Sequence, residues 1–330
     1  ALALSPDGSR LAYVAIQGGS QQIYLRSMDS LETRALSGTE GAANPFFSPD
    51  GQWLGFVAGG RLKKVSVSGG AAVTLGSSSS GSGTRGASWG SQGTILFTPS
   101  TVSPLQQVPD AGGASLPLTR LEKSEISHRW PDLLPGGQAV LFAASLSVTN
   151  WTNAQIAVQS LVTGERRNLI PGGTHPRYAS SGHLIYAQGG SLMAVPFDPQ
   201  RLQVKGTAVP VVEGVLQSTV SGNAQYSISA TGSLVYVAGR SQGTQSKLVW
   251  ISRNGTEQPL PAAGRAYRAP RLSPDGRRIA VTIDEQETQI WLYDTSRDTL
   301  TRFTFEGTAN SVSPWTPDSK RIVFSSNKAG

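Results

Sequence analysis

The stretch Pro45-Phe46-Phe47-Ser48-Pro49-Asp50-Gly51-Gln52-Trp53-Leu54-Gly55-Phe56 decides the fold of this chain. Proline presets the backbone angle that opens a tight turn, aspartate accepts hydrogen bonds from the N–H groups just after it, and glycine adopts a positive φ at little cost. Apolar residues flank the turn on both sides. The stretch therefore predicts a β-hairpin, a strand followed by a turn and a second strand.

Related turns return along the whole chain, at intervals of 42 to 50 residues. In each repeat, an apolar strand follows the turn, and two further strand-like segments come after it. Four antiparallel strands in a unit of about 40 to 45 residues are typical of one blade of a β-propeller. The eight turns end at Gly8, Gly51, Gly93, Gly137, Gly182, Gly232, Gly276 and Ser319.

The sequence thus predicts an all-β fold, a β-propeller of four-stranded antiparallel blades with seven complete repeats plus half of an eighth. We expect residues 1–330 to form a single propeller that is a fragment of a longer chain. Residues 312–327 supply only the first two strands of the last blade. An unpaired strand edge is a site for pairing with another chain, so a downstream segment or a partner is expected to complete this blade.

Composition excludes several classes of function. The formal charge is +7, but the 28 basic residues are scattered, whereas a nucleic-acid site needs a concentrated basic stripe. The absence of cysteine excludes disulfides and thiolate metal sites. No apolar run is long enough to span a membrane, so we expect contact with a membrane only through a tether outside this chain.

The candidate binding residues lie on the strand that precedes each turn. Side chains alternate across a strand, so the position five residues before the turn is predicted to face the central channel, opposite a large apolar position. Other polar residues precede these strands, at the predicted channel mouth, where they are either ligand-binding or solvated loop residues around a water-filled tunnel. Together the candidates are Asn44, Phe46, Arg85, His128, Arg129, Asp132, His175, Arg177, Gln225, Arg268 and Arg271.

We expect no catalytic residue, no metal ion and no cofactor. Residues 86–90 match the G-x-S-x-G nucleophile elbow, but this motif requires a strand, a strained turn and then a helix, and no helix is predicted after Ser88. His128 and His175 could converge at the channel mouth, with Asp132 as the nearest carboxylate for a metal site.

The turns followed by aromatic strands, in residues 5–15, 48–58 and 273–283, resemble the TolB-like propeller repeats of bacteria, which cover the whole chain. Residues 25–32, 41–51 and 127–131 are more narrowly similar to the WD40-like repeat region that follows the kinase domain in bacterial membrane-anchored serine/threonine protein kinases. The resemblance implies an extracytoplasmic sensor domain, in the periplasm or at the cell surface, joined by one membrane helix to a kinase. No kinase motif occurs in this chain, since residues 128–130 read His-Arg-Trp rather than His-Arg-Asp.

The expected function is a non-catalytic interaction or ligand-sensing module that binds a protein or small molecule at the channel mouth. One alternative is a propeller hydrolase or lyase using His128, His175 and Asp132, or the accessory propeller of a TolB-like serine peptidase. Another is a structural subunit of an envelope complex, docked through its open edge.

Overall fold

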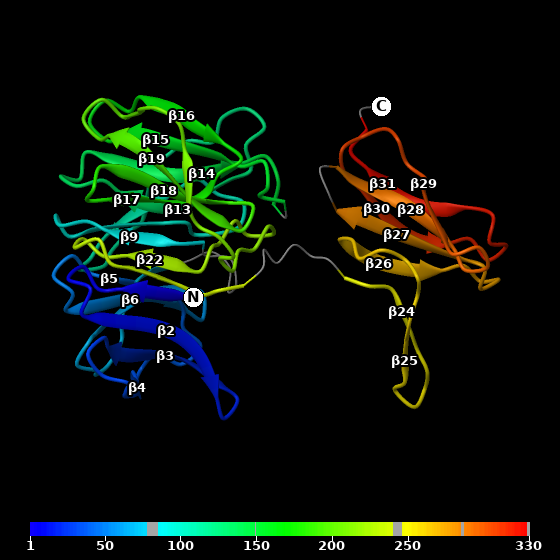
Figure 1. Cartoon of the computed structure of the whole chain (residues 1–330), viewed down its shortest axis with the longest axis horizontal. Coiled ribbons are helices and arrows are strands. Elements are labelled where there is room, and N and C mark those ends of the chain that lie inside the picture. Colours follow the sequence, from blue (N-terminus) through cyan, green and yellow to red (C-terminus); the bar gives the residue numbers. More distant parts are fainter. Residues whose placement is uncertain (78–84, 149, 240–245, 285–286, 329–330) are drawn as a thin grey trace. The chain divides into compact units, whose positions relative to one another are not determined.

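The computed structural model describes residues 1–77, 85–148, 150–239, 246–284 and 287–328 (Figure 1). Every regular element in these ranges is a strand, and every ladder between two named strands is antiparallel. These described residues contain no helix that could cross a membrane. Most strands lie in four-stranded sheets that follow the sequence repeat, so the chain has the all-β propeller fold that the sequence predicts.

The chain divides into two compact units, residues 1–241 and residues 242–330. In the first three sheets of unit 1 each strand pairs with the next one in sequence. They contain β1 (Leu2–Leu4), β2 (Arg10–Gln17), β3 (Ser20–Ser27) and β4 (Thr33–Ala35); β5 (Ala43–Phe47), β6 (Trp53–Ala58), β7 (Arg61–Ser66) and β8 (Val73–Ser77); and β9 (Ala87–Trp89), β10 (Thr94–Phe97), β11 (Gln106–Pro109) and β12 (Leu116–Pro117).

The remaining sheets of unit 1 complete its series. The fourth contains β13 (Ser127–Leu133), β14 (Ala139–Ser145), β15 (Gln155–Ser160) and β16 (Arg166–Pro171). The fifth contains β17 (Thr174–Ala179), β18 (His183–Gln188), β19 (Ser191–Asp198), β20 (Gln203–Val204) and β21 (Val209–Val212), of which both β20 and β21 pair with β19. A two-stranded sheet of β22 (Tyr226–Ile228) and β23 (Leu234–Tyr236) follows.

Unit 2 contains one four-stranded sheet and two hairpins. Its strands are β24 (Val249–Ile251) and β25 (Glu257–Pro259); β26 (Tyr267–Leu272), β27 (Arg278–Asp284), β28 (Thr288–Asp294) and β29 (Thr299–Arg302); and β30 (Asn310–Trp315) and β31 (Ile322–Ser326). The sixth sequence repeat therefore contributes one hairpin to each unit rather than one four-stranded sheet. The single propeller, with seven complete repeats plus half of an eighth, stays a prediction.

The repeated turn has the predicted geometry. Gly51 has φ +67°, and its N–H donates to the Ser48 carbonyl at 2.9 Å. The Asp50 carboxylate accepts hydrogen bonds from the Ser48 hydroxyl and from the Gln52 N–H. Asp7, Asp275 and Asp318 make the same two types of hydrogen bond in their own turns. These aspartates are structural.

Unit 1 closes on itself after the β22–β23 hairpin. The Leu4 N–H of β1 donates to Ser227 Oγ of β22 at 3.0 Å, across 223 residues of sequence. The Ala230 N–H donates to the Pro6 carbonyl at 2.8 Å. Separate apolar clusters fill the spaces between successive sheets; one joins Ile23 of the first sheet to Phe56 of the second. The closed ring places β1, β5, β9, β13, β17 and β22 around one central cavity.

A substitution at Gly55 can test the side-chain packing inside this ring. It lies opposite Phe46 across the β5–β6 pair, and a Cβ added to Gly55 would lie under 3.0 Å from three atoms of the Phe46 ring. Close approach of another group is one reason for a glycine inside a strand. We expect Gly55→Ala to lower the free energy of unfolding by about 1–3 kcal/mol, measured by urea denaturation.

A double-mutant cycle with Phe46→Ala identifies the cause. Removing the ring removes the clash, so the double variant is expected to lose less stability than the sum of the two single variants. Strict additivity would show that the Phe46 ring does not lie over Gly55.

Candidate functional site

The central cavity of unit 1 has a volume of about 350 Å³ and is lined by all six innermost strands. The position five residues before each turn contributes a side chain in every repeat of this unit, as the alternation predicts. These residues are Ala3, Phe46, Ser88, Asp132, Arg177 and Ser227. Of the sequence candidates, Asn44, Phe46, Asp132, His175, Arg177 and Gln225 line the cavity. Their role in binding stays a prediction.

A repeated backbone bulge aims three more side chains into the cavity. In β5, β13 and β17 the pairing register shifts at a residue that precedes proline and has a positive φ: Asn44 at 50°, Trp130 at 56° and His175 at 50°. Bulges of this kind redirect side chains. The sequence contains a signal for this bulge, which is a proline six residues before the glycine that ends the turn. Alternation along a regular strand does not account for a bulge, so Trp130 is absent from the sequence candidates.

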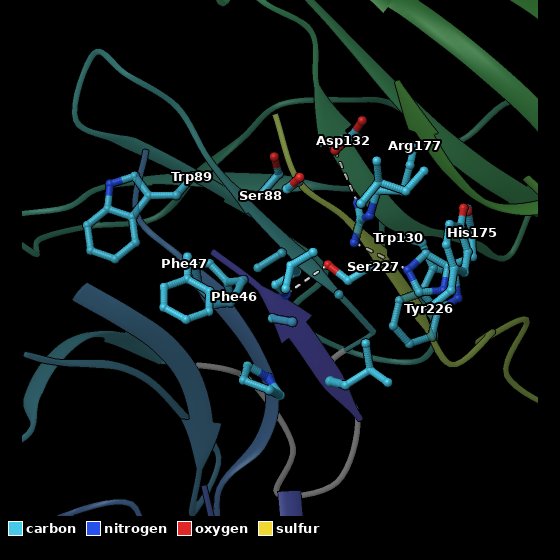
Figure 2. A pocket seen from close by; sticks show the side chains of 18 of the residues that line it. Phe46, Phe47, Ser88, Trp89, Trp130, Asp132, His175, Arg177, Tyr226 and Ser227 are labelled. Atoms are coloured by element: carbon cyan, nitrogen blue, oxygen red, sulfur yellow. Dashed lines mark hydrogen bonds and ion pairs between the residues drawn. The ribbon is translucent and has the colours of Figure 1, made fainter. Parts of the chain in front are cut away.

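Asp132 and Arg177 form the charged centre of the cavity (Figure 2). Arg177 Nη1 lies 3.3 Å from Asp132 Oδ1 and donates to the Pro131 carbonyl at 2.9 Å. The other oxygen of Asp132 accepts the Tyr178 N–H at 2.7 Å. Burial raises the pKa of Asp132, and the Arg177 guanidinium only partly opposes this effect. The two charges therefore compensate one another at the cavity wall.

His175 is 5% exposed and stacks on the Trp130 ring, with 4.7 Å between the ring centroids. Burial lowers its pKa well below the usual value, and the positive charge of Arg177 adds to this shift. The ring is therefore neutral at pH 7. The Ala224 N–H donates to Nδ1 at 3.1 Å, and from this contact we assign the single ring proton to Nε2.

Aromatic side chains form the opposite side of the cavity. Figure 2 shows Phe46, Phe47 and Trp89 grouped away from Arg177 and His175. The rings of Phe46 and Trp89 meet edge to face, with 6.1 Å between their centroids. The cavity thus has a group of aromatic side chains on β5 and β9, whereas its charged pair, Asp132 and Arg177, lies on β13 and β17.

Trp130, which lines the cavity, and its neighbour Arg129 are 3% and 1% exposed. The Arg129 guanidinium lies 4.0 Å from the Trp151 ring centroid and donates to the carbonyls of Thr101 and Val148. Trp130 Nε1 donates to the Ser221 carbonyl at 2.9 Å. Burial, and then the charge of Arg85, lower the pKa of Arg129 to about 9. Arg129 is therefore a charged structural residue that joins three loops.

The cavity reaches the surface on the side of the repeated turns. Its lining extends to the exposed turn residues Pro49, Pro135, Ser180 and Ala230. Access is therefore from the side of the repeated turns. Asn44, His175 and Gln225, which the sequence places at the opposite end where the innermost strands begin, also line the cavity, and ligand binding at that end stays a prediction.

His128 lies inside the protein and does not line the cavity. Its Nε2 lies 3.0 Å from Glu125, which also pairs with Arg166 at 2.6 Å, and its Nδ1 lies 2.8 Å from the Thr119 hydroxyl. Burial would raise the pKa of Glu125, but hydrogen bonds from Arg166 and His128 hold it well below the usual range. His128 is a buried structural residue in this network.

The other candidates lie elsewhere. Arg85 is partly buried outside the cavity lining, and its carbonyl accepts hydrogen bonds from Thr98 and Trp130. Arg268 and Arg271 belong to unit 2, where Arg268 pairs with Asp284 at 2.9 Å and Arg271 is exposed.

The G-x-S-x-G string has a packing explanation. A Cβ on Gly86 would lie 2.7 Å from the Trp130 ring, and Gly90 allows Leu133 a similarly close approach. Ser88 Oγ accepts the Leu133 N–H at 3.0 Å. In the described ranges, no three His, Cys, Asp or Glu side chains gather closely enough to hold a metal ion. His128 and His175 have different partners and are not brought together.

No protein-family model and no curated protein matches the chain. The chain is similar to the solved Swd1 (Cps50) β-propeller domain of Myceliophteria thermophila, with a TM-score of 0.47, 12% identity, and coverage of 96% of this chain and 89% of that one. It is also similar to a puromycin hydrolase mutant complexed with PGG, with a TM-score of 0.49, 17% identity, and coverage of 91% and 52%.

Arg129→Met tests the structural role of this arginine. The variant keeps an apolar stem but removes the donor of the Thr101 carbonyl and one of the two donors of the Val148 carbonyl, so we expect a loss of about 2–3 kcal/mol in the free energy of unfolding. Arg167→Met, at a partly exposed arginine paired with Glu165, is the control and should change stability by less than about 0.5 kcal/mol. Equal effects of the two changes would contradict this role.

Burial of neutral His175 predicts a pH dependence of stability. The unfolded histidine binds a proton below about pH 6.5, whereas the folded one resists protonation until a lower pH. Stability should therefore fall as pH decreases from 6.5 to 5, by up to about 1.4 kcal/mol per pH unit for this group. His128, whose pKa is also lowered, adds in the same direction, and Asp132 opposes it.

The comparison is between variants. Chemical denaturation at several pH values should give a flatter profile for His175→Asn than for the unaltered chain. His183→Asn, at the partly exposed first residue of β18, is the control. An unchanged slope in His175→Asn would show that His175 is not held neutral.

Proposed function

We propose that this chain is a non-catalytic ligand-sensing or interaction module whose ligand site is the central cavity of unit 1. One observation carries the proposal: the cavity is amphipathic, and its charged side chains, Asp132 and Arg177, pair with one another. A concave site with an aromatic wall and a few convergent polar groups is typical of small-molecule recognition.

The contacts of the polar residues favour binding over catalysis. A nucleophile needs a base within hydrogen-bond reach, with a third group that orients the base. Ser88 Oγ accepts a backbone N–H, and both nitrogens of His175 face the donors of Ala224 and Arg177. In the described residues lining the cavity, no serine is hydrogen-bonded to a histidine.

We further propose that the chain is the extracytoplasmic part of a bacterial receptor-like serine/threonine kinase, or a stand-alone relative. The support is the resemblance of residues 25–32, 41–51 and 127–131 to the repeat region of those kinases. The full reading frame that encodes this chain tests the kinase assignment, since a kinase domain and a membrane helix should precede these repeats. A reading frame without them would contradict the kinase assignment and leave the cavity as it is.

Two measurements on the purified chain test the binding function. A panel of ester and peptide substrates should show no hydrolysis above that of heat-denatured protein. A thermal-shift screen of small molecules should give ligands that raise the unfolding temperature of the unaltered chain but not of Ser88→Phe, which fills the cavity. Ser68→Phe, at an exposed serine, is the control.

Hydrolysis that Ser88→Ala or His175→Asn abolishes would overturn the non-catalytic assignment. A screen without any ligand, or ligands that bind Ser88→Phe as tightly as the unaltered chain, would overturn the cavity as the ligand site.

A further inference from the structure

Two hydrogen-bond donors converge on the polar side of the cavity. Because the ring proton of His175 lies on Nε2, this nitrogen donates, and Arg177 Nη2, which can only donate, lies 3.2 Å away from it. Two donors at this distance do not satisfy one another. The Asn223 side chain also forms a hydrogen bond with the imidazole that raises the pKa of His175, so a ligand oxygen would share the ring N–H with Asn223. An oxygen placed beside the two donors would accept a hydrogen bond from each, and one of these bonds would be charge-assisted.

The donors of Arg177 are only partly used within the described residues. Nη1 donates to the Pro131 carbonyl and to Asp132, while the contact of Nη2 is with His175. The side chain of Arg177 keeps 22% of its surface exposed, in the cavity wall. A carboxylate is the group whose geometry best fits a guanidinium edge.

A carboxylate alone would meet the negative charge of Asp132. The cavity charges of Asp132 and Arg177 sum to zero, and His175 is neutral, so an added anion leaves an uncompensated negative charge in a partly buried site. Each oxygen of Asp132 accepts one hydrogen bond, from Arg177 or from the Tyr178 N–H, and a carboxylate has room for about four. A cationic group on the same ligand would restore the balance and bind to Asp132.

The structure points to a small zwitterion with an apolar group as the ligand, and this inference rests on the proposed ligand-binding function of the cavity. We infer that the carboxylate of the ligand binds between Arg177 and His175, that its ammonium group binds Asp132, and that its apolar group packs on Phe46 and Trp89. This is the chemistry of an apolar or aromatic α-amino acid.

Binding of three related probes to the unaltered chain tests the inference without any variant. The probes are L-phenylalanine, which carries both charges, N-acetyl-L-phenylalanine, which carries only the carboxylate, and L-phenylalaninamide, which carries only the ammonium group. Isothermal titration calorimetry at pH 7 should show binding of L-phenylalanine, and each single-charge probe should bind at least tenfold more weakly.

Variants then assign each charge to its residue. Asp132→Asn should weaken L-phenylalanine at least tenfold and remove its advantage over the N-acetyl probe. Arg177→Gln should remove the higher affinity of L-phenylalanine relative to L-phenylalaninamide. Arg167→Gln is the matched control, because Arg167 also pairs with a carboxylate and donates to a carbonyl but lies on the surface, and its affinities should equal those of the unaltered chain. Circular dichroism spectra confirm that each variant is folded.

The outcomes separate this inference from the function on which it rests. Equal binding of all three probes, or no binding of L-phenylalanine up to 10 mM (roughly the weak limit of specific recognition), would overturn the zwitterion assignment. If the small-molecule screen still gave ligands excluded by Ser88→Phe, the cavity would remain the ligand site for another class of molecule. Failure of that screen would overturn both.

Discussion

Closure of unit 1 between β1 and β22 is the constraint on which the rest of this structure depends. A blade of a propeller buries its two faces only against its neighbours, so the first and last sheets of a row would expose apolar surface. Hydrogen bonds from Leu4 to Ser227 and from Ala230 to Pro6 join the two ends of the row. The cavity exists because six innermost strands then face a common axis.

Closure also explains why charged groups are tolerated inside the ring. Arg177 compensates Asp132, and the backbone carbonyls of three loops surround the Arg129 guanidinium, which also stacks on Trp151. Each buried charge is held by groups from more than one sheet. The same contacts that satisfy the charges therefore fix the blades to one another.

The sequence predicted the parts of this structure that repeat. The turn at residues 48–51 and its period fixed the strands, and alternation from the turn identified Phe46, Asp132 and Arg177 as cavity residues. Contacts between distant segments could not be predicted in this way. His128 precedes an innermost strand like His175, but it bonds to Glu125, whose other partner, Arg166, lies 41 residues further on. The division of the sixth repeat between two units likewise leaves no trace in the period.

Amide hydrogen exchange at the junction between β1 and β22 tests closure of the ring most directly. If β1 packs on β22, the Leu4 and Ala230 amides, which donate across the junction, should exchange as slowly as amides inside the sheets of unit 1. Exchange of these two amides at the rate of unpaired, exposed amides, while the β6 amides remain protected, would show that unit 1 is open between β1 and β22 and would contradict the cavity described above.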